Sequence, residues 1–131
     1  MNEVKQMMIG EFLIRERGYD FMGYRLNKKD SLTFHHLIIP KRKGGLITRN
    51  NGAIIQRIPH DYLHLIESID YEIFYYLTSE MIDMNVKGYL DRDNLINIRL
   101  LLEEFESKHD KDLTKKGRVL IKTEYKQGRV F

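Results

Sequence analysis

Cysteine is absent from all 131 residues of the chain. Its absence excludes disulfide bonds and any zinc site built on thiolates, and it is compatible with a reducing compartment. The chain also lacks an apolar run near the roughly 20 residues that a membrane-spanning helix needs. Its first twelve residues, MNEVKQMMIGEF, are too charged and too short for a signal peptide. We therefore expect a cytoplasmic protein with no membrane partner.

Repeats, low-complexity tracts and a linker rich in proline and glycine are absent as well. With the length of the chain, this predicts a single domain over residues 1–131. Apolar residues make up 42% of the sequence and charged residues 31%, which fits a soluble globular protein. A chain of this size can bury a core without covalent staples.

The net charge of +3 is unevenly distributed. Residues 35–64 carry five basic and one acidic side chain, residues 65–113 five and twelve, and residues 114–131 six and one. The first and last of these segments would attract a polyanion such as nucleic acid, whereas the middle segment would repel it. An ordinary solvated surface would explain the same charges, so charge alone does not decide between the two interpretations.

Apolar spacing and turn residues predict an α+β protein. Antiparallel strands are expected at residues 32–39 and 53–58. Helices are expected at about residues 3–17, 59–68, 70–85 and 91–108. Residues 19–26 are expected to form an irregular strand, residues 27–30 a turn, and residues 114–131 a basic tail that is extended in part.

The last three predicted helices carry stripes of apolar side chains. We interpret these stripes as core rather than as ligand contacts. Their members are Tyr62, Leu63, Ile66, Ile73, Leu77, Met81, Met84, Leu95, Ile98, Leu102 and Phe105. Asp70 is expected to cap the third helix, and Asp91 or Asp93 the fourth. These two helices could also form a homodimer interface.

Four of the five histidines lie within residues 34–66. His60 and His64, four apart on a helix, share one face and could bind one metal ion. His35 and His36 are adjacent on a strand and point to opposite faces. We therefore expect His35 to join the helical pair as a ligand and His36 to stay off the metal as a general base. Strand and surface histidines without a ligand role are the alternative.

A basic, glycine-rich loop separates the histidine pairs. Its glycine and asparagine residues, Gly44-Gly45 and Asn50-Asn51-Gly52, tolerate positive φ. Basic side chains in and near the loop could grip backbone phosphates, with a solvated loop as the alternative. These side chains are Lys41, Arg42, Lys43, Arg49 and Arg57.

Together these features resemble the motif of the HNH endonuclease family, also called the ββα-metal or His-Me finger family. The family motif runs from a His-His or Asp-His pair through Ile-Pro and a basic, glycine-rich loop to an asparagine and a histidine entering a helix. The matching residues are His35-His36, Ile39-Pro40, Lys41 to Gly45, Asn51 and His60, with His64 as an extra helical ligand. The resemblance covers a quarter to a third of the chain.

The resemblance implies a ββα-metal (HNH) core over about residues 32–68, with a helical extension over residues 70–108. It implies that His35, His60 and His64 hold one divalent cation. Mg²⁺ is expected in cells, although Zn²⁺, Ni²⁺ or Mn²⁺ would also suit. His36 would activate water, and Asn51 would brace the loop and orient His36.

The implied activity is hydrolysis of DNA phosphodiester bonds, with RNA as an alternative substrate. A non-catalytic nucleic-acid-binding module and a purely structural metal site are further alternatives. The size of the chain suggests phage or mobile-element biology by analogy with the family. His109 is expected to be an ordinary surface histidine, and Tyr62 could contact phosphate if it is not core.

The sequence departs from the family pattern in one respect. Many members carry a zinc knuckle of two Cys-x-x-Cys pairs, which a chain without cysteine cannot form. Residues 19–23 stand where the first pair would be, and residues 57–60 stand near the second. We expect apolar packing by Tyr19, Phe21 and Met22 to replace the zinc.

Overall fold

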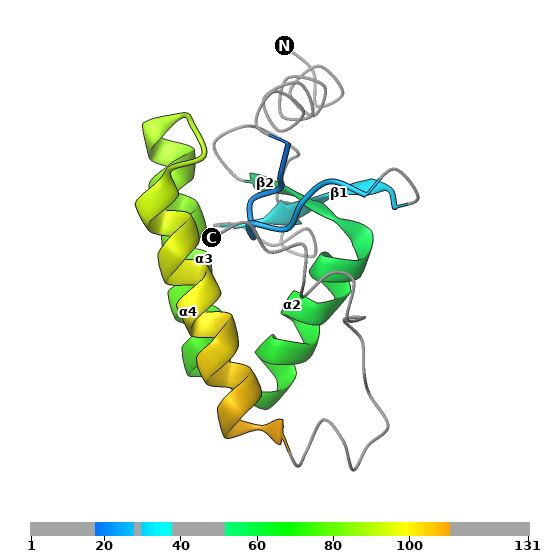
Figure 1. Ribbon diagram of the computed structural model, residues 1–131, viewed down its shortest axis with the longest axis vertical. Helices are drawn as coiled ribbons and strands as arrows, with labels where there is room; N and C mark the ends of the chain where they lie inside the picture. Colours follow the sequence, from blue (N-terminus) through cyan, green and yellow to red (C-terminus); the bar gives the residue numbers. More distant parts are fainter. Residues whose placement is uncertain (1–17, 28–29, 38–51, 111–131) are drawn as a thin grey trace.

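The computed structural model describes residues 18–27, 30–37 and 52–110, and in them a β-hairpin is followed by helices (Figure 1). The elements are β1 (Leu32–His36), β2 (Gly52–Gln56), α2 (Arg57–Ile69), α3 (Tyr71–Lys87) and α4 (Arg92–Lys108). The predicted α+β class is confirmed, in a layout compatible with a ββα arrangement. The predicted helix at 3–17, the basic loop and the tail lie outside the described residues. Within the described residues, no helix is long and apolar enough to cross a membrane.

The two strands are antiparallel, and both differ from their predicted bounds. His36 pairs with Gly52 at one end of the hairpin, and Leu37 already lies outside β1. Gly52 lacks a positive φ, and its role is to admit the ring of Phe34. A Cβ atom on Gly52 would lie 1.8 Å from that ring, so no other residue fits there. The hairpin therefore needs this glycine for close approach.

Helix α2 begins at Arg57, two residues before the predicted start, and the prediction that β2 extends to residue 58 is wrong. The free N–H groups of the first turn explain the difference. The N–H of Arg57 donates to the carbonyl of Ser31 (2.9 Å), and that of Ile58 donates to a carboxylate oxygen of Asp30 (3.0 Å). Pro59 has no N–H to satisfy. The segment before β1 thus caps the helix that carries two of the histidines.

Residues 19–25 form a tight turn rather than the predicted irregular strand. Tyr19 and Arg25 pair with each other in an antiparallel bridge, and Gly23 lies between them with φ of +81°. The N–H of Phe21 donates to the carbonyl of Ile54, which ties the turn to β2. Met22 is buried, so the expected apolar packing is present in part.

A buried carboxylate holds this turn in addition to the apolar contacts. One oxygen of Asp20 accepts the backbone N–H groups of Met22 (2.9 Å) and Tyr24 (3.2 Å). The other accepts the backbone N–H (3.2 Å) and the side-chain amide (3.1 Å) of Gln56. The Gln56 amide also donates to the carbonyl of Arg25. This Asp20–Gln56 clasp joins the turn to the end of β2, a polar role that the sequence analysis missed.

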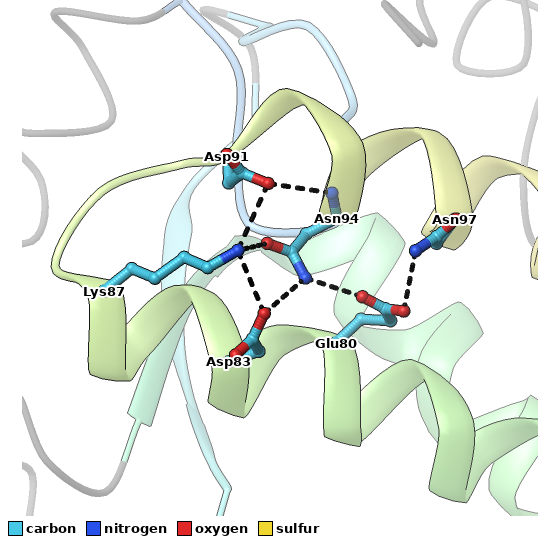
Figure 2. Close-up of polar contacts among 6 residues, drawn as sticks. All are labelled: Glu80, Asp83, Lys87, Asp91, Asn94 and Asn97. Atoms are coloured by element: carbon cyan, nitrogen blue, oxygen red, sulfur yellow. Dashed lines mark hydrogen bonds and ion pairs between the residues drawn. The ribbon is translucent and has the colours of Figure 1, made fainter.

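Helices α3 and α4 lie side by side, and a polar cluster joins them near one end (Figures 1 and 2). The side-chain amide of Asn94 donates to Glu80 (2.7 Å) and Asp83 (3.0 Å), and its oxygen accepts from Lys87 (2.9 Å). Asp91 caps α4 by accepting the N–H of Asn94, which decides between the two predicted caps.

The core is formed mainly by the predicted helical stripes together with β2. Asp70 caps α3 as predicted, and Gly88 ends it in the left-handed conformation. All eleven stripe residues named above are buried. The amide of Asn85 on α3 donates to the carbonyl of Gly52 (2.7 Å), so the helical extension also supports the hairpin.

Candidate metal centre

Strand β1 and helix α2 bring three predicted ligands together. Nδ1 of His35 lies 3.2 Å from Nε2 of His60, and Nε2 of His64 lies 3.1 Å from the same His60 atom. Each of the three histidines offers one ring nitrogen, and these nitrogens all lie within 4.8 Å of one another. Three side chains from two elements thus converge on one point.

These separations suit three ligands of one metal ion. Imidazole nitrogens bound about 2.1 Å from a tetrahedral zinc ion lie about 3.4 Å apart. The cluster is close to that spacing, and it could hold a metal ion. His35 is buried, His60 is half-buried and His64 is exposed. The exposed side leaves room for water or for another ligand.

Electrostatics keeps the inner rings neutral at pH 7. Burial, followed by repulsion from the other histidines, lowers the pKa of His35 to about 3. Burial, followed by repulsion from His64, lowers the pKa of His60 to about 4. A neutral imidazole keeps one nitrogen lone pair, which metal binding requires. The cluster therefore presents nitrogen donors without first losing protons.

Three neighbours of the cluster were not predicted from the sequence. The hydroxyl of Thr33 lies 2.7 Å from Nδ1 of His60, and a Glu67 carboxylate oxygen lies 3.1 Å from Nδ1 of His64. The ring of Phe74 on α3 packs edge-on to His35. Thr33 could have been found, because it is two residues before His35 and alternate strand residues share a face. Glu67 is one helical turn beyond His64, a spacing that also places them side by side.

His36 follows His35 on β1, where the strand pleat turns successive side chains to opposite faces. Its ring packs edge-on against Phe34, with the ring centroids 4.9 Å apart. Its Nε2 atom is covered and has no hydrogen-bond partner among the described residues. Nε2 of His35 is in the same condition. Buried polar atoms without partners are uncommon and concentrate at functional sites.

The predicted nucleic-acid contacts are outside the described residues, with one exception. Arg57 lies at the start of α2, is exposed, and forms an ion pair with Asp61 (3.2 Å). The other four basic residues, together with Asn50 and Asn51, lie in the part of the chain that the structure does not describe. Their roles stay predictions.

Two remaining predictions concern residues away from the cluster. His109 is not an ordinary surface histidine, because it lies largely covered at the end of α4 with Nε2 2.8 Å from a carboxylate oxygen of Asp70. Tyr62 is core, and its hydroxyl donates to Glu106 (2.7 Å). Neither residue belongs to the three-histidine cluster.

Chemically, the cluster can hold a cation through nitrogen donors on a hairpin-and-helix frame, with one side open to solvent and a fourth histidine on the adjacent strand position. Comparison of the chain with protein-family models, with curated proteins and with solved structures gives no match.

Proposed function

We propose that this protein is a metal-dependent endonuclease that hydrolyses phosphodiester bonds of DNA in the manner of the HNH family. The observation that carries the proposal is the convergence of His35, His60 and His64 nitrogens on a β-hairpin and the following helix. The HNH motif resemblance and this geometry are independent of each other. A purely structural metal site would not require the open side or the neighbouring His36.

The residues present fit a single divalent cation. Three neutral imidazoles supply the nitrogen donors that Zn²⁺, Ni²⁺ and Mn²⁺ accept, whereas Mg²⁺ prefers oxygen ligands but is abundant in cells. When bound, the cation would contact an oxygen of the scissile phosphate and stabilise the departing 3′ oxygen. The exposed edge at His64 is where the phosphate would enter.

His36 takes a proton from the attacking water in this proposal. The water oxygen bonds to phosphorus, the bond from phosphorus to the 3′ oxygen breaks, and the 3′ oxygen receives a proton from solvent. Because Nε2 of His36 is covered, Nδ1 is the ring nitrogen that faces this task. Asn51 is proposed to orient the ring, and the basic residues at 41–43, 49 and 57 to bind flanking phosphates.

A nicking assay tests the proposal. Supercoiled plasmid is incubated with the protein in Mg²⁺, Mn²⁺, Zn²⁺ or Ni²⁺, with EDTA as the blank. We expect nicked circles in at least one metal, their loss in EDTA, and a loss of about 100-fold or more in rate for His36→Ala. His109→Ala is the matched control, because it removes a histidine far from the cluster, and it should cut normally.

Two outcomes would count against the proposal. A His36→Ala protein that cuts as fast as the parent would overturn the assigned base. Salt-sensitive DNA binding without nicking in any metal would favour the non-catalytic binding module. The same assay with single-stranded RNA decides between the two nucleic-acid substrates.

A further inference from the structure

Thr33 makes two hydrogen bonds that bear on the protonation of His60. Its side-chain oxygen lies 2.6 Å from the carbonyl oxygen of Ile55 and 2.7 Å from Nδ1 of His60. Ile55 lies directly opposite Thr33 in the hairpin, so the first bond crosses from β1 to β2. The second bond joins the hairpin to α2.

A hydroxyl group has one proton to donate and can accept through its lone pairs. A carbonyl oxygen only accepts, so the Thr33 proton must point to Ile55. The Thr33 oxygen can then only accept from the His60 ring, and Nδ1 of His60 must be the donor. A neutral imidazole carries a single N–H, so Nε2 of His60 keeps its lone pair.

That lone pair belongs to the atom on which the cluster converges. Nε2 of His60 is the shared neighbour of Nδ1 of His35 and Nε2 of His64. In the opposite tautomer, Nε2 of His60 would carry a hydrogen pointing into the cluster. A cation could not bind that nitrogen until the proton had moved.

We propose that Thr33 is a positioning residue of the metal centre, which fixes His60 in the tautomer that exposes Nε2 before any metal arrives. The proposal rests on the metal centre of the proposed function and does not depend on DNA cleavage. Partners of this kind fix ring orientation and typically change metal affinity about 10–100-fold when they are removed.

His64 offers an internal comparison. Glu67 accepts from Nδ1 of His64, which favours Nε2 as the free nitrogen there also. That pair is exposed, with 52% of the His64 side chain and 42% of the Glu67 side chain accessible. Water can replace Glu67 at this position, whereas the bond of Thr33 to His60 is partly buried and crosses two elements. Thr33 therefore has the stronger control over its histidine.

The test uses the full-length protein and Zn²⁺ as the probe. Ring-nitrogen NMR of the metal-free protein at pH 7.5 should show His60 protonated at Nδ1. Thr33→Val, which has nearly the same shape without the hydroxyl, should mix the two tautomers and weaken Zn²⁺ binding by about 10–100-fold in calorimetry. Thr33→Ser should restore both properties to wild-type values. Thr78→Val is the matched control, because the Thr78 hydroxyl is buried on α3 with no partner among the described residues.

The outcomes separate this proposal from the proposed function. His60 protonated at Nε2 in the wild-type protein would overturn the role of Thr33, even if Thr33→Val failed to fold. Unchanged Zn²⁺ affinity in a folded Thr33→Val protein would overturn it too. A protein with the expected tautomer and affinity that never nicks DNA would leave Thr33 as the positioning residue and would count only against the nuclease.

Discussion

Two buried polar groups lie at the two ends of the hairpin and differ in how they are satisfied. The Asp20 carboxylate, next to Gln56, accepts four N–H groups and leaves no oxygen without a donor. His35, paired with Ala53 in the hairpin, faces other ring nitrogens and keeps a covered Nε2 with no partner among the described residues. Both groups cost desolvation energy when they fold.

The difference separates a structural role from a binding role. A polar group whose partners all come from the chain is complete, and it stabilises the fold through those partners. Ring nitrogens that converge on one another leave lone pairs that only a proton or a cation could satisfy. The Asp20–Gln56 clasp is therefore interpreted as framework and the three-histidine cluster as a site. Each of the following experiments can break or sharpen this comparison.

The largest expected effect is on stability, from Asp20→Ala. This substitution leaves four buried donors on Met22, Tyr24 and Gln56 without an acceptor, which should cost about 3–5 kcal/mol of the free energy of unfolding. Urea denaturation measures it. Asp61→Ala is the control, since that aspartate is exposed and should change stability by about 0.5 kcal/mol or less. A loss under 1 kcal/mol for Asp20→Ala would contradict the structural role of the clasp.

His60→Ala should have the opposite profile. It removes a ligand, so Zn²⁺ affinity should fall more than about 100-fold, beyond the loss expected for a supporting partner. Metal-free stability should change by about 1 kcal/mol or less, because Thr33 keeps its bond to Ile55 and no buried donor is orphaned. Calorimetry with Zn²⁺ and urea denaturation in EDTA measure the two quantities. Equal loss of stability and affinity would mean that the cluster is framework after all.

The pH dependence of stability gives a third test. Burial, opposed by the four hydrogen bonds, raises the pKa of Asp20 from 3.8 to about 6. The folded state then holds more protons than the unfolded state between pH 4 and 6, so the Asp20 contribution to stability rises on acidification through that window and falls as pH rises. Between pH 7 and pH 5 the gain should be about 1 kcal/mol.

This pH effect is measured as a difference between proteins, because the histidines titrate as well. Asp20→Asn cannot titrate at this position, and the two proteins share every other group. Urea unfolding of both at pH 7 and pH 5 isolates the Asp20 contribution. If the gap between wild type and Asp20→Asn stays constant with pH, the carboxylate has an ordinary pKa and its four donors outweigh burial.

The sequence predicted the ligands better than the frame. His35, His60 and His64 could be grouped because strand and helix spacing restrict which side chains share a face. The helical stripes could be found for the same reason, and the caps Asp70 and Asp91 follow local rules that hold within one turn.

The misses depend on distant contacts. The start of α2 is set by Asp30 and Ser31, 26 or more residues earlier in the chain. Asp20 meets Gln56 across 36 positions, and no local pattern marks that pair. Gly52 was assigned to turn chemistry, whereas its requirement comes from the Phe34 ring on the opposite strand. Each miss is a side chain or backbone group whose partner is chosen by tertiary packing.

The smallest expected effect comes from Glu67→Gln, and it tests how far the support of the cluster extends. The glutamine oxygen can still accept from Nδ1 of His64, and both side chains are exposed, so loss of the negative charge should weaken Zn²⁺ binding less than about threefold. Glu72→Gln, an exposed charge loss on α3, is the control in the same titration. A tenfold loss confined to Glu67→Gln would mean that the exposed edge is as tightly organised as the buried edge at Thr33. The phosphate would then have to enter the site from a different side.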